Sequence, residues 1–275
     1  MSLITLTTDI GQKDYLVGAI KGQLLSINPG FTVVDISHNI SPFNYPEAAY
    51  IFKNSFHHFP EYSFHLVLVN LFDTKKDHLL LAYHQKQYIA CADNGLLTMI
   101  LEEPPELVIS IPFPPHEQHT TLACTALWGN SISKFLAGAA FGSLGNEVEK
   151  IVEKLPLKPS VHDNWMEAHI IHIDHFENVV VNITQAEFEA QRKDRRFKII
   201  FRRDETVRSI SETYADVPEN EKLALFNSAG YLEIAINKGN AAGLFGLQLF
   251  KNPGQAAYQQ SRMFYQTVRI EFIDN

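Results

Sequence analysis

The sequence has few cysteines and no long apolar run. Its 275 residues include only two cysteines, Cys91 and Cys124, each in an apolar stretch. Two such residues indicate buried thiols in a reducing compartment rather than a disulfide framework. No apolar segment approaches the ~20 residues that a membrane-spanning helix needs, and the N-terminal stretch lacks the basic residues of a secretory signal. We therefore expect a cytoplasmic protein without a membrane partner.

Basic residues are also fewer than acidic residues. There are 23 lysines and arginines against 31 acidic residues, which gives a formal net charge of −8. Such a field repels nucleic acid but not a small cation. The basic run at residues 192–196, continued at 202–203, is interrupted by acidic residues, which favours a solvated hairpin face over a nucleic-acid contact. The sequence also lacks a P-loop, a GxGxxG fingerprint, a GxSxG elbow and an HExxH helix.

Residues 1–155 alternate between strand and helix patterns. Apolar and β-branched runs predict strands over residues 2–7, 32–36, 64–69, 78–83 and 87–92. Helical spacing predicts helices over residues 15–27, 46–56, 94–101 and 132–141. This alternation is typical of an α/β domain, with a largely parallel open sheet flanked by helices on both faces.

The pattern changes after the stiff segment LPLKP at residues 155–159, which indicates a domain boundary. Short alternating runs then predict strands over residues 168–173, 179–183, 197–201, 223–226, 231–236 and 268–273. We expect an α/β domain over residues 1–155, a linker over 156–165, and a small antiparallel β-barrel domain over 166–275.

Two turns of the first domain carry candidate ligand groups. Asp9 follows the first predicted strand, and ligands of open α/β sheets bind outside the carboxyl ends of the strands. A carboxylate there can accept two hydrogen bonds from a ribose diol, although a helix cap or an Asx turn uses the same residue type. Asn94 lies in an Asn-Gly turn after a strand, and its amide suits a nucleoside edge if the turn faces the crevice.

The second domain contains a histidine-rich segment and a serine turn. On a strand, His172 and Asp174 share one face while His169 and His175 take the other, so the spacing argues against a metal site. A carboxylate at Asp174, leaving the strand, can instead hold an ammonium group. Ser228 lies in a glycine-containing turn, which is either an ordinary hairpin loop or a nest of amides for a carboxylate.

Five segments in this order resemble the S-adenosylmethionine (SAM) hydroxide adenosyltransferases, also called SAM hydrolases, and the related SAM-dependent chlorinases and fluorinases. The segments are LTTDIG with YLVGAIKG (residues 6–11 and 15–22), VDISHNI (34–40), ADNGLLT (92–98), IDHFEN with NI (173–178 and 182–183), and NSAGYLEIAINKGNAA (227–242). The resemblance implies a larger α/β domain, a small β-barrel, and a homotrimer with each site between subunits.

The same resemblance implies roles for individual residues. It places Asp9 on the ribose hydroxyls, Phe43 against the sugar and Asn94 near the nucleoside. It further implies that Asp174 and Asn178 hold the methionine amino end and the adenine. Ser228 falls where the methionine carboxylate is bound. No metal and no cofactor is implied, since SAM is itself the substrate or ligand.

The water-activating residues of the hydrolases are replaced. Asn70, in the segment VNLFDTKK (69–76), stands for an aspartate, and Lys75 or Lys76 falls near the place of an arginine. Trp128, in LWGN (127–130), stands for a histidine, and Gly129 resembles the chlorinases at the halide-adjacent position. We expect the catalytic group to comprise Asn70, Lys76, Trp128 and Gly129.

Three functions remain open. The leading hypothesis is an adenosyltransferase-like enzyme in which water or hydroxide displaces methionine from C5′ of SAM, with halide a less favoured nucleophile. The second is a non-catalytic binder of SAM or adenosine, because Asn70 cannot act as a base near neutral pH. The third is a metal-dependent hydrolase that uses His172, Asp174 and His175.

Overall fold

The computed structural model describes residues 2–101, 103–202, 205–247 and 266–274. The chain divides into two compact units, Met1–Pro156 and Leu157–Asn275. Each unit has its own hydrophobic core. The segment predicted as a linker, 156–165, contains the short strand β8 (Ser160–Val161), which pairs with β9 (Trp165–Ile173). That segment is therefore part of the second unit's sheet.

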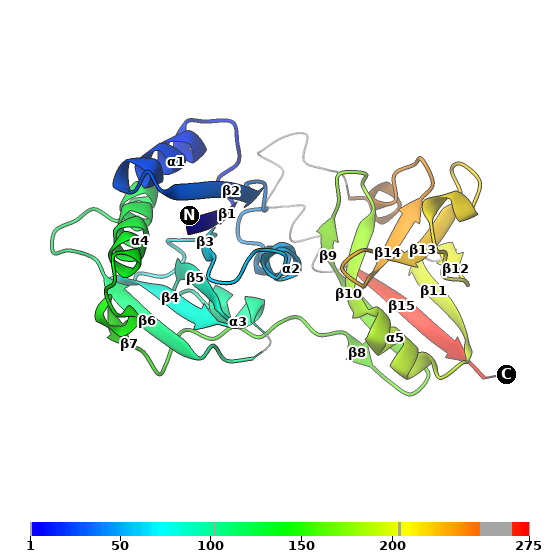
Figure 1. Cartoon of the computed structure of the whole chain (residues 1–275). Helices are drawn as coiled ribbons and strands as arrows, with labels where there is room; N and C mark the ends of the chain where they lie inside the picture. Colours follow the sequence, from blue (N-terminus) through cyan, green and yellow to red (C-terminus); the bar gives the residue numbers. More distant parts are fainter. Residues whose placement is uncertain (1, 102, 203–204, 248–265, 275) are drawn as a thin grey trace. The chain divides into compact units, whose positions relative to one another are not determined.

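The first unit is built on a seven-stranded mixed sheet in the order β2-β1-β3-β5-β4-β6-β7 (Figure 1). The strands are β1 (Ser2–Thr8), β2 (Phe31–Ser37), β3 (Phe64–Leu68), β4 (His78–His84), β5 (Gln87–Ala92), β6 (Leu107–Pro112) and β7 (Asn146–Glu147). The first four in sheet order are parallel, while β4, β6 and β7 pair antiparallel. The sheet is thus mixed rather than largely parallel.

Helices cover both faces of this sheet, as expected. Helices α1 (Leu16–Ile27) and α4 (Thr121–Leu136) pack together on one face, and α2 (Tyr45–Phe56) and α3 (Leu96–Ile100) on the other (Figure 1). The expected helix over 132–141 was wrong in its start. Thr120 Oγ1 accepts the amide of Ala123 at 3.1 Å, and this cap begins α4 at Thr121.

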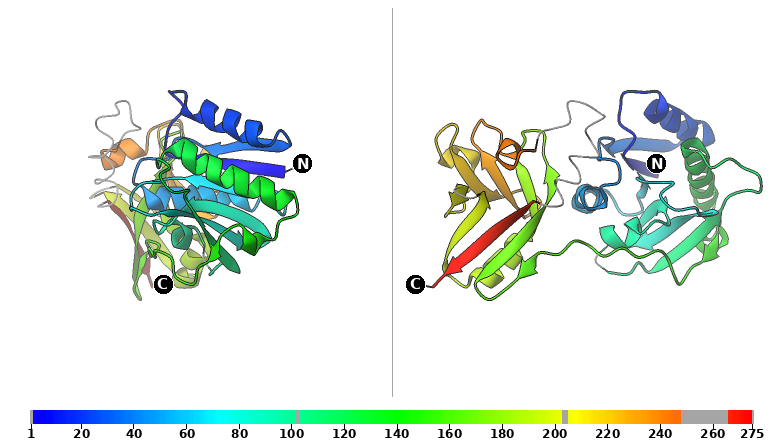
Figure 2. Two further views of the ribbon diagram at one scale, coloured as in Figure 1. Left: turned by 90° about the vertical axis from the view of Figure 1, so that its left-hand side faces the viewer. Right: turned by 180° about the vertical axis from the view of Figure 1, so that it is seen from behind.

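The second unit is an antiparallel, nearly closed barrel in the order β12-β11-β15-β9-β10-β14-β13 (Figure 2). Besides β8 and β9 its strands are β10 (Val179–Thr184), β11 (Arg196–Arg202), β12 (Glu205–Val207), β13 (Lys222–Phe226), β14 (Tyr231–Ile236) and β15 (Thr267–Ile273). Strands β12 and β13, at the two ends of this order, lie beside each other. The barrel prediction is confirmed.

One helix of the second unit was not predicted. Helix α5 (Gln185–Arg192) begins with a capping box, in which Thr184 and Glu187 each accept from the other's backbone. The basic run at residues 192–196 therefore ends this helix and begins β11. The guanidinium of Arg195 donates to the carbonyls of Gln191, Arg192 and Asp163, so it closes the end of the helix. Arg203, the last residue of the basic run, lies outside the described residues.

Candidate functional site

The carboxyl ends of the parallel strands bring together residues that are far apart in the sequence. Asp9 follows β1, and Asn70 follows β3, the neighbouring strand. Asp9 Oδ2 accepts the backbone N–H of Asn70 at 2.9 Å. Burial raises the pKa of Asp9, while this hydrogen bond opposes the rise. This half-buried carboxylate lies at the edge where such sheets bind ligands.

Asn70 joins three loops at this edge. It adopts the left-handed conformation, with φ of 50°, which asparagine tolerates better than most residues. Its Oδ1 accepts the backbone N–H of Phe43 at 2.9 Å, and its carbonyl accepts from Asn94 Nδ2 at 2.9 Å. Phe43, itself at φ of 63°, has 67% of its surface exposed. Asn70 therefore holds an exposed aromatic ring in place, with its own side chain buried.

Asn94 holds the loop of Asn70 in place through hydrogen bonds to its backbone. It is fully buried, and its Nδ2 donates to the carbonyls of Val69 and Asn70 at 3.1 and 2.9 Å. Its Oδ1 accepts the amide of Leu96 at 3.0 Å, at the start of α3. Both Nδ2 hydrogens are thus used inside the protein. Asn94 thus positions the loop of Asn70, and its expected contact with a nucleoside stays a prediction.

A second polar cluster lies beside Asn70. The Tyr45 hydroxyl donates to Asp73 Oδ2 at 2.7 Å, and the Lys154 ammonium lies 3.2 Å from the same oxygen and 3.5 Å from the Tyr45 ring centroid. Burial first, then the Asp73 carboxylate, raises the pKa of Tyr45. The hydrogen bond from Tyr45 lowers the pKa of Asp73. Tyr45 is therefore a neutral donor that fixes the loop after β3.

A buried relay anchors the other flank of Asp9. Thr8 Oγ1 lies 3.0 Å from His38 Nδ1, His38 Nε2 lies 3.1 Å from Asp35 Oδ1, and Lys21 pairs with Asp35 at 2.6 Å. The interactions with Lys21 and His38 lower the pKa of Asp35 against the opposing effect of burial. Thr8 and His38 are buried whereas Lys21 and Asp35 reach the surface, so this relay links the β1 and β2 ends next to Asp9 to a surface ion pair.

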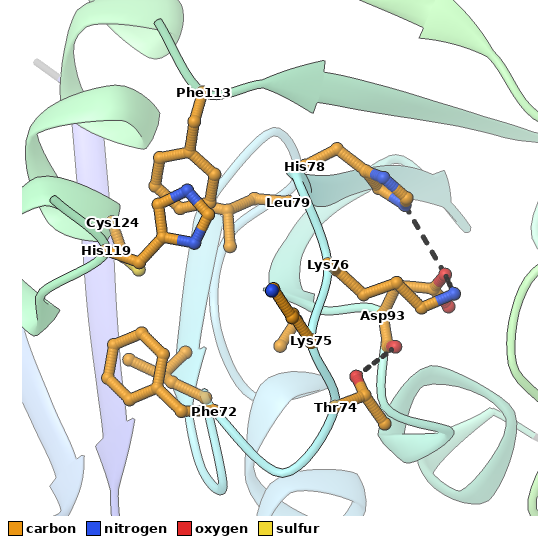
Figure 3. Close-up of a pocket in the computed structure, with 12 residues that line it drawn as sticks. Phe72, Thr74, Lys75, Lys76, His78, Leu79, Asp93, Phe113, His119 and Cys124 are labelled. Carbon is orange, nitrogen blue, oxygen red and sulfur yellow. Dashed lines mark hydrogen bonds and ion pairs between the residues drawn. The ribbon is translucent and has the colours of Figure 1, made fainter. Parts of the chain in front are cut away.

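A cavity of about 190 Å³ opens next to the loop that Asp9 and Asn70 hold (Figure 3). Three described segments and the start of α4 line it. The lining residues are Leu71, Phe72, Thr74, Lys75, Lys76, His78, Leu79, Ala92, Asp93, Phe113, His119 and Cys124. Its lining contains two lysines and two histidines but one carboxylate, so the cavity is basic although the chain as a whole is acidic.

Asp93 is the buried counter-charge of this cavity. Its Oδ2 lies 2.9 Å from Lys76 Nζ and 3.4 Å from His78 Nε2, and its Oδ1 accepts the amide of Val152 at 2.7 Å. Lys75 has no ion-pair partner among the residues that the structure describes. In Figure 3, Lys76 and His78 turn toward Asp93, while Lys75 extends toward the side of the cavity where His119 lies.

Trp128 and Gly129, which were predicted for the catalytic group, do not line this cavity. The Trp128 ring is fully buried in the core between α4 and the sheet, and its Nε1 donates to the Leu80 carbonyl at 3.1 Å. A Cβ at residue 129 would lie 3.0 Å from side-chain carbons of Leu24 and Ile27, so Gly129 permits close packing of α1 and α4. Asn70 does not line the cavity either, because the lining starts at Leu71.

Sequence reasoning missed His119 and Cys124 as lining residues. Both flank the first turn of α4, whose N-cap Thr120 is the signal that locates this turn in the sequence. Burial raises the pKa of Cys124 to about 12, so its thiol stays protonated and is a weak nucleophile. His119 is exposed, with its ring stacked on Phe113 at a centroid distance of 4.0 Å.

In the second unit, Asp174 organises the turn between β9 and β10. Its Oδ1 accepts the amides of Phe176 and Asn178 at 2.9 and 2.8 Å, and its Oδ2 accepts Asn178 Nδ2 at 3.0 Å. The carboxylate is half-buried and Asn178 is buried. Both predicted residues therefore belong to one rigid turn. Within the described residues no group of three histidines, cysteines or acids is arranged to hold a metal ion.

Ser228 lies in the turn between β13 and β14. Asn227 Oδ1 accepts the amides of Ala229 and Tyr231, and Gly230 takes φ of 75°, a conformation that favours glycine. Ser228 is exposed at the tip of this turn. The turn adjoins the end of β10 through the bond from the Gln185 amide to the Gly230 carbonyl, whereas the Asp174 turn precedes the start of β10.

Glu233 lies on β14 between these two turns and was not predicted as part of a site. It is buried, its carboxyl accepts the Tyr214 hydroxyl at 2.7 Å, and burial raises its pKa. The nearby Asp174 carboxylate contributes to the same rise. A two-unit protein with a carboxylate at the parallel strand ends and a second at a barrel turn has the features of a small-molecule-binding protein.

Comparison with known families makes this class specific. The model of the SAM hydroxide adenosyltransferase N-terminal domain matches residues 4–143, and that of the corresponding C-terminal domain matches residues 168–252. Together these matches cover most of both units. The chain therefore belongs to the SAM hydroxide adenosyltransferase family.

Curated relatives are similar over nearly their whole length. Two proteins named (R)-S-adenosyl-L-methionine hydrolase are each 26% identical to this chain. The one from Methanocaldococcus jannaschii is matched over 90% of this chain and 93% of that protein, and the one from Thermus thermophilus over 90% and 97%. A fluorinase from an Actinoplanes species is 25% identical, over 90% and 94%.

A solved structure agrees with the fold. The crystal structure of an uncharacterized conserved protein from Thermotoga maritima superposes with a TM-score of 0.80 at 23% identity, covering 97% of this chain and 99% of that one. Within the described residues, no helix is both long and apolar enough to cross a membrane.

Proposed function

We propose that this protein binds SAM and transfers its adenosyl group to water, which displaces methionine from C5′ and yields adenosine and methionine. The observation that carries the proposal is the basic cavity of Lys75, Lys76, His78 and His119, next to the loop that Asp9 holds. A carboxylate for the ribose and an adjoining cavity for a nucleophile are the two parts that such a displacement needs. Further support comes from the hydrolase relatives.

The chemistry asks little of an acid or base at the leaving group. The sulfonium leaves as a neutral thioether, so the rate depends mainly on orientation and on a nucleophile held away from bulk water. In this proposal Asp9 accepts the ribose hydroxyls, and Phe43 covers the sugar. Lys75 favours hydroxide over water by its charge, whereas the charge of Lys76 is paired with Asp93. SAM is the substrate, and no further cofactor takes part.

The second unit supplies the methionine end of the proposed site. Asp174 and Asn178 are the proposed partners of the ammonium group and the adenine, and Ser228 that of the carboxylate. The rigidity of the Asp174 turn suits such a role, because little entropy is lost on binding. We further propose a cytoplasmic homotrimer in which each site combines the first unit of one subunit with the second unit of another. Sedimentation with and without SAM tests the assembly.

A non-catalytic SAM or adenosine binder is the second candidate, and one observation favours it. The position that carries an aspartate in the hydrolases is Asn70, and its Oδ1 is occupied by the Phe43 amide. As an amide, Asn70 supplies no base for water near neutral pH. A halide nucleophile is a third outcome, since fluorinases are among the relatives.

The test is a product assay with SAM in the presence and absence of chloride. Adenosine, 5′-chloroadenosine and methionine are separated by chromatography, and Asp9→Ala is run in parallel. Asp14→Ala, which changes an exposed carboxylate in the following loop, is the matched control. Adenosine that disappears in Asp9→Ala but not in Asp14→Ala supports the hydrolase.

The other outcomes separate the alternatives. A chlorinated product assigns the protein to halide transfer. Absence of product with a SAM-dependent rise in melting temperature supports the binder. Absence of both contradicts SAM as the ligand.

A further inference from the structure

Two side chains of the basic cavity, His119 and Lys75, are not engaged in ion pairs or hydrogen bonds with described residues. Lys76 and His78 are directed to Asp93, at 2.9 and 3.4 Å. His119 contacts Phe113 through its ring face only, which leaves both ring nitrogens available. In Figure 3, His119 and Phe72 lie on one side of the cavity, and Lys75 reaches toward them from the loop after β3.

The surroundings of this pair combine apolar walls with access to solvent, because Phe72, Lys75 and His119 are all exposed. Phe72, Phe113, Leu79 and the protonated Cys124 thiol supply apolar or weakly polar walls. The cavity volume of about 190 Å³ is several times the ~30 Å³ that a water molecule occupies in the liquid, so a water and the edge of a ligand fit together.

We infer that His119 is the catalytic residue that removes a proton from the attacking water, and that Lys75 stabilises the resulting hydroxide. This assignment rests on the proposed SAM hydrolysis. One water O–H bond breaks and its proton binds the free ring nitrogen of His119. The hydroxide oxygen forms the bond to C5′ while the C5′–S bond breaks. The electron pair of the broken bond stays on sulfur, so methionine leaves with a neutral thioether. The exposed His119 then releases the proton to solvent.

Histidine is the side chain suited to this step near neutral pH, and neither Asn70 nor the buried Trp128 can replace it. The charged and titratable groups that face it come from each neighbouring element. They are Lys75, Lys76, His78 and Asp93 across the cavity, and Glu117 in its own loop. Lys76 is neutralised by Asp93, so Lys75 is the positive charge left for hydroxide.

The test compares His119→Gln with wild type and with His116→Asn. His116 lies in the same loop, is exposed and does not line the cavity, and asparagine tolerates its φ of 66°. SAM affinity is measured by calorimetry and adenosine release by chromatography between pH 5.5 and 9. We expect His119→Gln to bind SAM as wild type does and to lose about 100-fold in kcat, the lower range for a general base.

Two further readouts separate a base from a structural residue. The wild-type rate should rise with pH as a histidine loses its proton, and His119→Gln should flatten this rise. Added imidazole should partly restore the rate of a His119→Gly variant and leave His116→Asn unchanged. Lys75→Met should lower kcat with little change in SAM affinity.

The results that overturn the assignment are distinct from those that overturn the function. Unchanged kcat and pH profile in His119→Gln overturn the role of His119 alone. A wild-type protein that binds SAM without releasing adenosine, or that does not bind SAM, overturns the hydrolysis and this assignment together.

Discussion

Each unit of this protein uses an aspartate at a strand end to fix an asparagine, but the two pairs are built differently. In the second unit, Asp174 accepts from Phe176 and Asn178, two and four residues away. In the first unit, Asp9 accepts from Asn70, which is 61 residues away. The Asp174 turn needs only its own hairpin to form, whereas the Asp9 contact exists only after β1 and β3 pair.

This difference has a consequence for function. A turn closed by its own side chain keeps its shape even when the packing around it changes. A contact between two strands responds to everything that moves either strand. We therefore expect the first unit to be the sensitive half of the site, and the variants below test that expectation.

The largest effect is expected at Asp9. Asp9→Ala removes both the proposed acceptor of the ribose hydroxyls and the acceptor of the Asn70 amide. Charge-assisted hydrogen bonds contribute about 1.5–3 kcal/mol each, so SAM affinity should fall by about 4 kcal/mol, roughly a thousand-fold. Calorimetric titration of wild type and variant with SAM measures this loss of affinity. An affinity that changes less than in Asp14→Ala would show that Asp9 only shapes the loop.

The second effect concerns another long-range contact of the first unit. His65 is fully buried on β3, with Nδ1 2.7 Å from Thr5 Oγ1 and Nε2 2.9 Å from Gln87 Oε1. Three phenylalanine rings, Phe52, Phe56 and Phe59, contact its ring. Burial lowers its pKa to about 4. In the neutral form that follows, Nε2–H donates to Gln87, and Nδ1 accepts from Thr5.

Because the folded pKa of His65 lies below the unfolded value of about 6.5, the unfolded chain binds more protons between these values. This contribution to stability is complete above pH 6.5 and is lost as pH falls toward 4. It amounts to about 3 kcal/mol. The free energy of unfolding, measured by urea unfolding at several pH values in this range, should change less with pH in His65→Gln than in wild type. His58→Gln, at an exposed position, should keep the wild-type pH dependence of the free energy of unfolding.

The smallest effect is expected at the self-contained turn. Asp174→Ala removes the acceptor of three hydrogen bonds and should lower the free energy of unfolding by about 1–2 kcal/mol. Asp174→Asn keeps the Oδ1 acceptor and should cost less stability, while losing the charge proposed to hold the SAM ammonium group. Equal loss of stability in both variants, measured by urea unfolding, would argue against a turn held by Oδ1.

The sequence pattern predicted the α/β and barrel classes because strand runs such as residues 87–92 and 231–236 are bounded by turn residues on both sides. It was less successful where a helix begins inside a polar loop. The start of α4 depends on the Thr120 cap, which the apolar periodicity did not reveal, so the helix was expected to begin at residue 132 instead of Thr121. Trp128 and Gly129 were expected in the catalytic group through the family resemblance. Those residues are explained by the packing of α4 against α1 and the sheet, which no local pattern encodes.

The residues of the candidate site likewise divide into those that the sequence predicts and those that depend on tertiary contacts. Asp9 and Asp174 could be chosen from the sequence because each lies at a strand end, whereas Lys76 was chosen through the family resemblance. The engagement of Asn94 by Val69 and Asn70 could not, because an Asn-Gly turn looks the same whether its amide faces a ligand or a loop. The place of His119 in the cavity could not be predicted either, because it depends on where α4 meets the loop after β3.

The sequence by itself determined the elements whose hydrogen bonds close within a few residues, namely the Asp174–Asn178 turn, the Asn227–Gly230 turn and the capped start of α5. Only the tertiary structure decided that Asp9 would hold Asn70, that His65 would be buried neutral between Thr5 and Gln87, and that His119 and Lys75 would face one cavity. The physical reason is that these contacts join residues tens of positions apart, and they form only when burial of the shared core brings the strands and helices together.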